Sequence, residues 1–346
     1  MIGQHVRWAG VALAGVITGM VLACGGVRAN AASAEYAAGG LVFKPSATIS
    51  MASEDLYRSM YQVRVGYVFH STAAATQDLL LAFPMPVLPV TGLNAVYADD
   101  ATEAPTGRVH HDLQPVPNYL DFTVRVNGQQ VTTRASGRAL LHGRDVSRLL
   151  QEAGMPLLFA VDVDSERAAQ ALPAAKRAQL VSAGLLRRAA SLNTMEPDIY
   201  VPLWDYQAVF EWHQAFTPGD TRVDISYAPR VGAVVDVAGS ESGYPPDSAG
   251  FSGYCIDGAM RQALGRYSPA HWDISTLGYV LTTANYWKGS IGRFHLVVEK
   301  PAPTDIVAFC PLDAKKITPT RFEWTRMNHV PKGDIKVMFF TSTGEP

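Results

Sequence analysis

The fold class is decided by the stretch Tyr61-Gln-Val-Arg-Val-Gly-Tyr-Val-Phe69. Aromatic and β-branched residues occupy every second position, and polar or small residues fill the positions between them. A period of two is typical of a strand that buries one face and exposes the other. The predicted buried face carries Tyr61, Val63, Val65, Tyr67 and Phe69. The stretch therefore predicts a β-strand packed against a core.

Further strands are predicted along most of the chain. Residues 79–83 form an apolar run that ends at Pro84, and residues 122–126 alternate up to Asn127-Gly128, a dipeptide suited to a tight hairpin turn. A second hairpin is expected from 209–216 and 221–227, around the turn Thr217-Pro-Gly-Asp220. Shorter strands are expected at 277–283, 293–299, 306–309, 321–326 and 335–340.

The middle of the chain changes to a helical pattern. Asp145 is a candidate cap for a helix that stops at Gly154, and a second helix is expected from Ala174 to Ala183. Because strands and helices do not alternate regularly, a doubly wound or barrel α/β fold is disfavoured. We predict a mainly β fold of the β-rich α+β class. Its parts are two β-sandwich-like modules at 30–143 and 191–346, the second with one helix near 255–266, and a helical insert at 144–190.

The first 29 residues resemble a cleaved export signal. Arg7 precedes an apolar stretch from Trp8 to Ala23, and small residues around Ala29 suit a signal peptidase, so we expect cleavage after Ala29. An uncleaved membrane anchor is an alternative, although the stretch is short for one. A second alternative is a lipid on Cys24, because Val21-Leu-Ala-Cys24 approximates a lipoprotein box. The expected location is the periplasm or the medium, with membrane contact only through the signal or that lipid.

Composition and cysteine content agree with an exported globular protein. The full chain has 346 residues, 48% hydrophobic, and a net charge of -2, which falls to -4 when Arg7 and Arg28 are removed with the signal. Such a charge gives no basic field for nucleic acid. The cysteines that remain after cleavage are Cys255 and Cys310. An even pair in an oxidising compartment predicts a disulfide.

Several blocks resemble one bacterial family, the domain of unknown function 4424. The blocks are Glu35-Tyr-Ala-Ala-Gly-Gly-Leu-Val-Phe43, Ser53-Glu-Asp-Leu-Tyr57, residues 61–69, Leu81-Ala-Phe-Pro-Met-Pro86, Phe210-Glu-Trp-His-Gln-Ala-Phe216, Tyr227-Ala-Pro-Arg-Val-Gly232, Tyr254-Cys-Ile-Asp257, Leu281-Thr-Thr-Ala-Asn-Tyr-Trp287, Phe294-His-Leu-Val-Val-Glu-Lys300 and Val307-Ala-Phe-Cys310. They cover most of the chain after the signal, whereas residues 99–118 show no such likeness. The resemblance implies an exported protein without an assigned activity, so it carries no catalytic residues over to this chain.

Two polar groups are candidates for chemistry. The cluster His110-His111-Asp112 offers imidazole and carboxylate ligands for a divalent metal, although adjacent residues on an extended loop point apart, which favours an ordinary polar loop. Glu211 and His213 share one strand face, with Asp205 just before it, and a carboxylate beside a histidine suits acid-base catalysis. The same face also fits a solvated strand. No Gly-x-Ser-x-Gly elbow and no phosphate-binding glycine loop occurs in the chain.

Aromatic residues offer a candidate binding surface. The candidates are Trp212, Tyr254, Tyr286 and Trp287, of which the last two were expected on a loop. Together these observations predict a periplasmic, non-enzymatic binding or structural module of the cell envelope. It would need no cofactor, and its partner would be another envelope protein or polymer. The alternative is a hydrolase, with or without a metal, that acts on envelope polymers through Asp205, Glu211 and His213.

Overall fold

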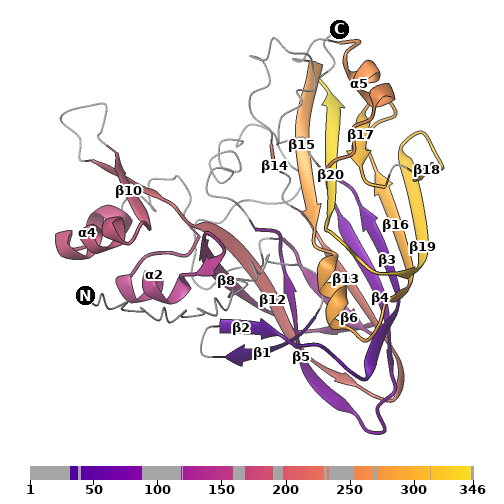
Figure 1. Cartoon of the computed structure of the whole chain (residues 1–346), viewed down its shortest axis with the longest axis horizontal. Helices are drawn as coiled ribbons and strands as arrows, with labels where there is room; N and C mark the ends of the chain where they lie inside the picture. Colours follow the sequence, from indigo (N-terminus) through magenta and orange to yellow (C-terminus); the bar gives the residue numbers. More distant parts are fainter. Residues whose placement is uncertain are drawn as a thin grey trace, which may run out of the picture.

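The structure is a computed structural model that describes residues 32–37, 40–87, 118, 120–158, 168–189, 198–229, 232–233, 253–267, 271–311 and 313–343. It is built mainly from strands, with few helices, and this confirms the predicted β-rich class (Figure 1). The predicted signal segment, with Cys24 and Ala29, lies outside the described residues.

The largest sheet has eight strands in the order β18-β19-β16-β3-β4-β13-β6-β7. All neighbours are antiparallel except β16 and β3, which run parallel. The strands are β3 (Ile49–Arg58), β4 (Val63–Ser71), β6 (Thr123–Val126), β7 (Gln129–Val131), β13 (Gly219–Tyr227), β16 (Ile291–Glu299), β18 (Lys315–Lys316) and β19 (Arg321–His329).

Strand β4 has the alternation that the sequence predicts. Val63, Val65, Tyr67 and Phe69 are all buried. Tyr61 was predicted on the same face, but this was wrong, because Tyr61 is 63% exposed. The backbone amide of Ser59 donates to the carbonyl of Gln62 at 2.9 Å, and this closed turn delays the start of the strand until Val63.

Two further sheets pack with the first. The six-stranded sheet has the order β2-β1-β5-β12-β8-β9, and the four-stranded sheet has the order β14-β15-β20-β17. Their strands are β1 (Ala32–Ala37), β2 (Gly40–Phe43), β5 (Gln77–Pro84), β8 (Arg134–Leu141), β9 (Arg144–Asp145), β12 (Asp205–Phe216), β14 (Gly232–Ala233), β15 (Trp272–Tyr279), β17 (Ile306–Phe309) and β20 (Ile335–Ser342). One cluster of buried side chains joins all three sheets.

The sheets interleave the two ranges predicted as modules. β3 and β4, from the first range, lie between β16 and β13, from the second. Likewise, β12 lies between β5 and β8. Both ranges therefore contribute neighbouring strands to the same sheets, and the domain boundaries at 143 and 191 stay a prediction.

The helical insert stands at one end of the molecule, away from β16 and β19 (Figure 1). It contains α2 (Ser147–Ala153), α4 (Ala174–Ser182) and β10 (Leu186–Ala189), and β10 pairs antiparallel with β11 (Ile199–Pro202), which follows the insert. Gly154 ends α2 with a φ of 82°, as its position predicts. A smaller apolar cluster that includes Leu150, Leu180 and Trp204 holds these elements together.

The other helices of the described residues lie in the last third of the chain. α5 (Gly258–Leu264) is shorter than the predicted helix over 255–266, because Asp257 caps it by accepting a hydrogen bond from the amide of Met260 at 2.8 Å. The short 3-10 helix η3 (Thr282–Tyr286) follows β15.

Candidate functional site

The predicted acid-base residues all lie on β12. Glu211 is only 4% exposed, and both of its carboxylate oxygens are bound: Oε1 accepts from Ser136 Oγ at 3.1 Å and Oε2 from Arg134 Nη2 at 3.3 Å. His213 is exposed. The structure therefore presents Glu211 as the partner of two β8 side chains.

Asp205 and Glu211 are too far apart to act on one bond. They lie six residues apart on one strand, and six steps of about 3.3 Å along an extended strand correspond to about 20 Å. Paired catalytic carboxylates in glycosidases are separated by about 5 to 9.5 Å. Within the described residues, this set therefore does not form a compact reaction centre.

The candidate aromatic residues have different surroundings. Trp212 and Trp287 are each 3% exposed. The Trp287 ring lies 4.6 Å from the ring of Phe69, so this indole belongs to the core. Tyr286 and Tyr254 are half-buried. Burial raises the pKa of Tyr254, and Lys336 Nζ lies 6.0 Å from the centre of its ring.

The predicted disulfide is present, and the candidate metal ligands lie outside the described residues. Cys255 and Cys310 are bonded, with their Cα atoms 5.4 Å apart. The bond joins the segment before α5 to the end of β17. His110, His111 and Asp112 lie outside the described residues. No group of three or more His, Cys, Asp or Glu side chains that could hold a metal is found among the residues that are described.

A row of polar residues crosses the exposed face of the eight-stranded sheet. The strand pairings align it without a gap from β19 to β6, and its members in order are Thr325, His295, Asp55, Gly66, Asp224 and Arg125. The sequence predicts each of these strands except β3, and only the pairing of distant strands brings these residues side by side. We call this feature the polar row.

Ion pairs link the polar row to its neighbours. Asp55 Oδ1 accepts from Arg293 Nη1 at 2.8 Å and lies 3.1 Å from His295 Nδ1. His295 Nε2 lies 3.7 Å from Glu323 Oε2. On the other side, Arg222 binds Asp224 through Nε and Nη2 at 2.8 and 2.7 Å.

Gly66 lets the charges approach one another across β4. A Cβ atom at Gly66 would lie 3.2 Å from Asp224 Oδ1 and 3.5 Å from Arg222 Nη2, so this ion pair lies over the glycine. The hydrogen bonds to Asp224 raise the pKa of Arg222, and the charges of Asp224 and Asp55 add to this effect. The result is a surface on which acidic and basic side chains are paired, a kind of pattern that gives specificity towards a charged partner.

A second polar cluster is buried between the eight-stranded and four-stranded sheets. Glu54 and Arg58, both on β3, are 0% exposed. Tyr279 Oη donates to Glu54 Oε1 at 2.8 Å and lies 2.9 Å from Tyr67 Oη. Arg58 donates to the backbone carbonyls of Leu277 at 2.8 Å and Ile335 at 3.1 Å. Burial lowers the pKa of Arg58 to about 10 and raises that of Tyr279 well above 10.

A β-bulge explains why these two charged residues point inward. Ile49 and Met51 are buried at the start of β3, but after the bulge the buried positions are Glu54, Leu56 and Arg58. The pairing with β4 shifts between Met51 and Ser53, where Ala52 is the extra residue. Sequence alternation alone gives no sign of this shift, so the buried cluster was not predicted.

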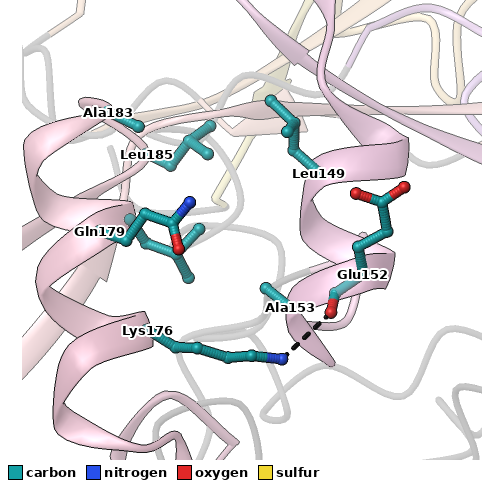
Figure 2. A pocket seen from close by; sticks show the side chains of 8 residues that line it. Leu149, Glu152, Ala153, Lys176, Gln179, Ala183 and Leu185 are labelled. Carbon is teal, nitrogen blue, oxygen red and sulfur yellow. Dashed lines mark hydrogen bonds between the residues drawn. The ribbon is translucent and has the colours of Figure 1, made fainter.

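A shallow pocket opens between α2 and α4 in the helical insert (Figure 2). Its volume is about 200 Å³, below the roughly 300 Å³ of typical small-ligand sites. Lys176 Nζ donates to the backbone carbonyl of Glu152 at 3.2 Å across its mouth. The lining residues are Leu149, Glu152, Ala153, Lys176, Gln179, Leu180, Ala183 and Leu185.

The chain belongs to the family described as "Domain of unknown function (DUF4424)", whose profile matches residues 29–338. The match covers nearly the whole chain, and it confirms the resemblance seen in the sequence blocks.

Comparison with other proteins adds little beyond the family. One solved structure that matches the chain is a candidate nutrient-binding protein of Legionella pneumophila subsp. pneumophila, with 16% identity, coverage of 91% of this chain and 70% of that chain, and a TM-score of 0.43. No curated protein matches the chain in sequence. Among the described residues, none of the helices combines the length and apolar character needed to cross a membrane.

Proposed function

We propose that this chain is an exported protein of the bacterial cell envelope that binds another envelope protein or polymer without catalysis. The observation that carries the proposal is the polar row with its ion pairs, which together span five neighbouring strands from β13 to β19. The expected export signal at residues 1–29 supports the location.

Recognition explains the polar row better than stability does. Asp55 is half exposed, and the side chain of Arg293 is 43% exposed. Exposed ion pairs contribute only about 0 to 1 kcal/mol to folding. Aligned charges on a sheet instead determine how a bound partner is oriented, and they disfavour partners whose charges do not match. The hydrolase alternative has less support, because both Glu211 oxygens are bound and Asp205 is distant.

In-cell photo-crosslinking tests the binding surface. A photoreactive residue at Val68, on the outward face of β4 beside Arg222 and Ser53, is expected to give one dominant adduct with an envelope component. Arg222→Glu with Arg293→Glu should abolish that adduct. The same photoreactive residue at the exposed Ser182 of α4 is the control and should give none.

Two further measurements can contradict the proposal. The intact mass of the native protein should correspond to a chain that begins at Asn30, and a mass that retains the first 29 residues would refute export with cleavage. Turnover of a polymer substrate by the purified chain, lost in Glu211→Gln or His213→Ala, would establish the hydrolase alternative. Absence of any adduct from the photoreactive residue at Val68 would refute the proposed binding surface.

A further inference from the structure

The outer edge of β19 is open over its second half. β16 pairs with β19 along its full length on one side, whereas β18 pairs on the other side only at Glu323 and Phe322. Figure 1 shows β18 and β19 at the outer margin of the eight-stranded sheet. Within the described part of the chain, no strand pairs with this side of residues 324–329.

The direction of the backbone groups follows from one hydrogen bond. The amide of Ile317 donates to the carbonyl of Arg321 at 2.8 Å, so the polar backbone groups of Arg321 point towards β18. The direction of these backbone groups alternates from one residue to the next along a strand. Those of Thr325 and Met327 therefore point to the same side as those of Arg321, at positions that β18 does not cover. The open edge therefore offers two N–H donors and two C=O acceptors to an added strand.

The open part of the edge lacks the usual protection against pairing. Edge strands are commonly blocked by lysine, proline or bulges, and β18 does carry Lys315 and Lys316. Beyond β18, however, the edge shows Met327, the most exposed of the large apolar side chains described, at 66%, and Val330 at 57%.

The charge of the segment that contains β18 and β19 indicates what kind of strand could pair with the open edge. Residues 313–332 contain five Lys or Arg and only two acids, in a chain whose net charge is -2. Arg326 binds Asp313 at 2.8 Å and Arg321 binds Glu323 at 3.1 Å. The cations left without an acidic partner among the described residues are Lys315, Lys316 and Lys332. A second copy of this chain would bring the same excess of positive charge against itself.

We propose that the open edge of β19 binds an extended, acidic segment of another protein, which adds to the sheet as a further strand next to Thr325 and Met327. Backbone hydrogen bonds would hold the segment, and its apolar side chains would cover Met327. Its acidic side chains would pair with Lys315, Lys316 and Lys332. This surface uses the backbone edge of β19, whereas the polar row uses side chains on the face of the sheet; Thr325 is the residue common to both. The edge needs none of the ion pairs of the polar row, so either proposal can fail without the other.

Fluorescence anisotropy with two labelled peptides tests this proposal. The probe is acetyl-(Glu-Val)4-amide, and its control is the sign-reversed acetyl-(Lys-Val)4-amide. The disulfide-bonded chain should bind the acidic peptide saturably and the basic peptide at least tenfold more weakly. Lys315→Glu with Lys316→Glu should weaken acidic-peptide binding at least tenfold, as should Met327→Pro, which removes an edge donor. Arg144→Glu with Arg148→Glu, at exposed positions of the helical insert, is the matched control and should not change it.

Hydrogen exchange keeps the test decisive if a variant folds poorly. In the unmodified chain, the acidic peptide should slow exchange at the amides of Thr325 and Met327 but not at those of β7, on the far edge. The proposal is overturned if neither peptide binds, if both bind equally, or if these amides stay unprotected at saturation. A concentration-dependent dimer that disappears in Met327→Pro would identify a second copy as the occupant and would also overturn it.

Discussion

Arg58 on β3 donates a hydrogen bond from Nη2 to the carbonyl oxygen of Leu277 on β15, at 2.8 Å. Its other terminal nitrogen reaches the carbonyl of Ile335 on β20, so one buried guanidinium holds both central strands of the four-stranded sheet against β3. A charge that is 0% exposed is costly unless it is hydrogen-bonded. Both terminal nitrogens of Arg58 are bonded in this way, whereas its Nε has no hydrogen-bond partner among the described residues. Arg58 is therefore a structural clamp between two sheets.

Replacement of Arg58 by lysine should destabilise the fold strongly. The shorter ammonium cannot reach both carbonyls, and loss of a partner from a buried charged group costs about 3 to 5 kcal/mol. Arg64→Lys is the matched control, because Arg64 is exposed and lies over the Tyr57 ring at 4.3 Å. Urea unfolding measures both. Equal stability of the two variants would show that Arg58 is not a clamp.

Stability should fall as the pH rises above about 10. Burial raises the pKa of Tyr227 and Tyr279 above their unfolded value of 10.0. The unfolded chain then releases protons that the folded chain keeps, and each tyrosine lowers the free energy of unfolding by about 1.4 kcal/mol per pH unit. Arg58 has a lowered pKa and acts in the opposite direction above pH 10. Because it is one group, it offsets the contribution of only one of the two tyrosines.

Urea unfolding at a series of pH values checks this dependence. Tyr227→Phe should reduce the alkaline loss by about one tyrosine's share, about 1.4 kcal/mol per pH unit. Absorbance near 295 nm should show that these two tyrosines ionise together with unfolding. Ionisation in the intact fold, well before unfolding, would contradict their burial.

Gly292→Ala should also destabilise the protein. A Cβ atom at Gly292 would lie 2.5 Å from the carbonyl oxygen of Ala52, the extra residue of the β-bulge. The strands must separate to accommodate it, at a cost of about 1 to 3 kcal/mol. Gly333→Ala is the control, since its Cβ meets no atom within 4 Å. Thermal unfolding should show a clear loss for the first variant alone; a Gly292→Ala protein of unchanged melting temperature would refute the close contact.

Removal of the disulfide should lower stability through the unfolded chain. Cys255 and Cys310 are 55 residues apart, and the chain-entropy model gives about 4 kcal/mol for a loop of this length. Cys255→Ser with Cys310→Ser should therefore unfold at lower urea, and reductant should shift the native protein by a similar amount. If reductant leaves the native midpoint unchanged while the thiols become free, the bond contributes no stability.

Local patterns in the sequence predict the strands better than they predict the sites. The alternation at 63–69 identifies β4, because one solvated face keeps the period of two visible. β12 is harder to interpret, since most of its residues on both faces are buried. Trp287 looks like a loop aromatic in the sequence, yet it packs against Phe69 and Phe216, which come from two other strands. Such contacts depend on the pairing of distant segments.

The two polar clusters show the same limit. The polar row exists only because the parallel neighbours β3 and β16 place Asp55 beside His295, 240 residues further along the chain. The buried cluster depends on the bulge at Ala52, which reverses the expected faces of β3. Residue types suggest candidates, but the relative placement of strands decides which candidates meet.

The bulge also gives β3 one residue more than regular pairing with β4 requires. Deletion of Ala52 would join Met51 to Ser53 and keep their partners Phe69 and Val68, so Glu54 and Arg58 would stay buried. Deletion of a residue between Glu54 and Arg58 would instead turn part of the buried face outward, because the residues on one side of the gap would shift by one position. A deletion scan should therefore show a tolerated gap at Ala52 beside an intolerant stretch from Glu54 to Arg58.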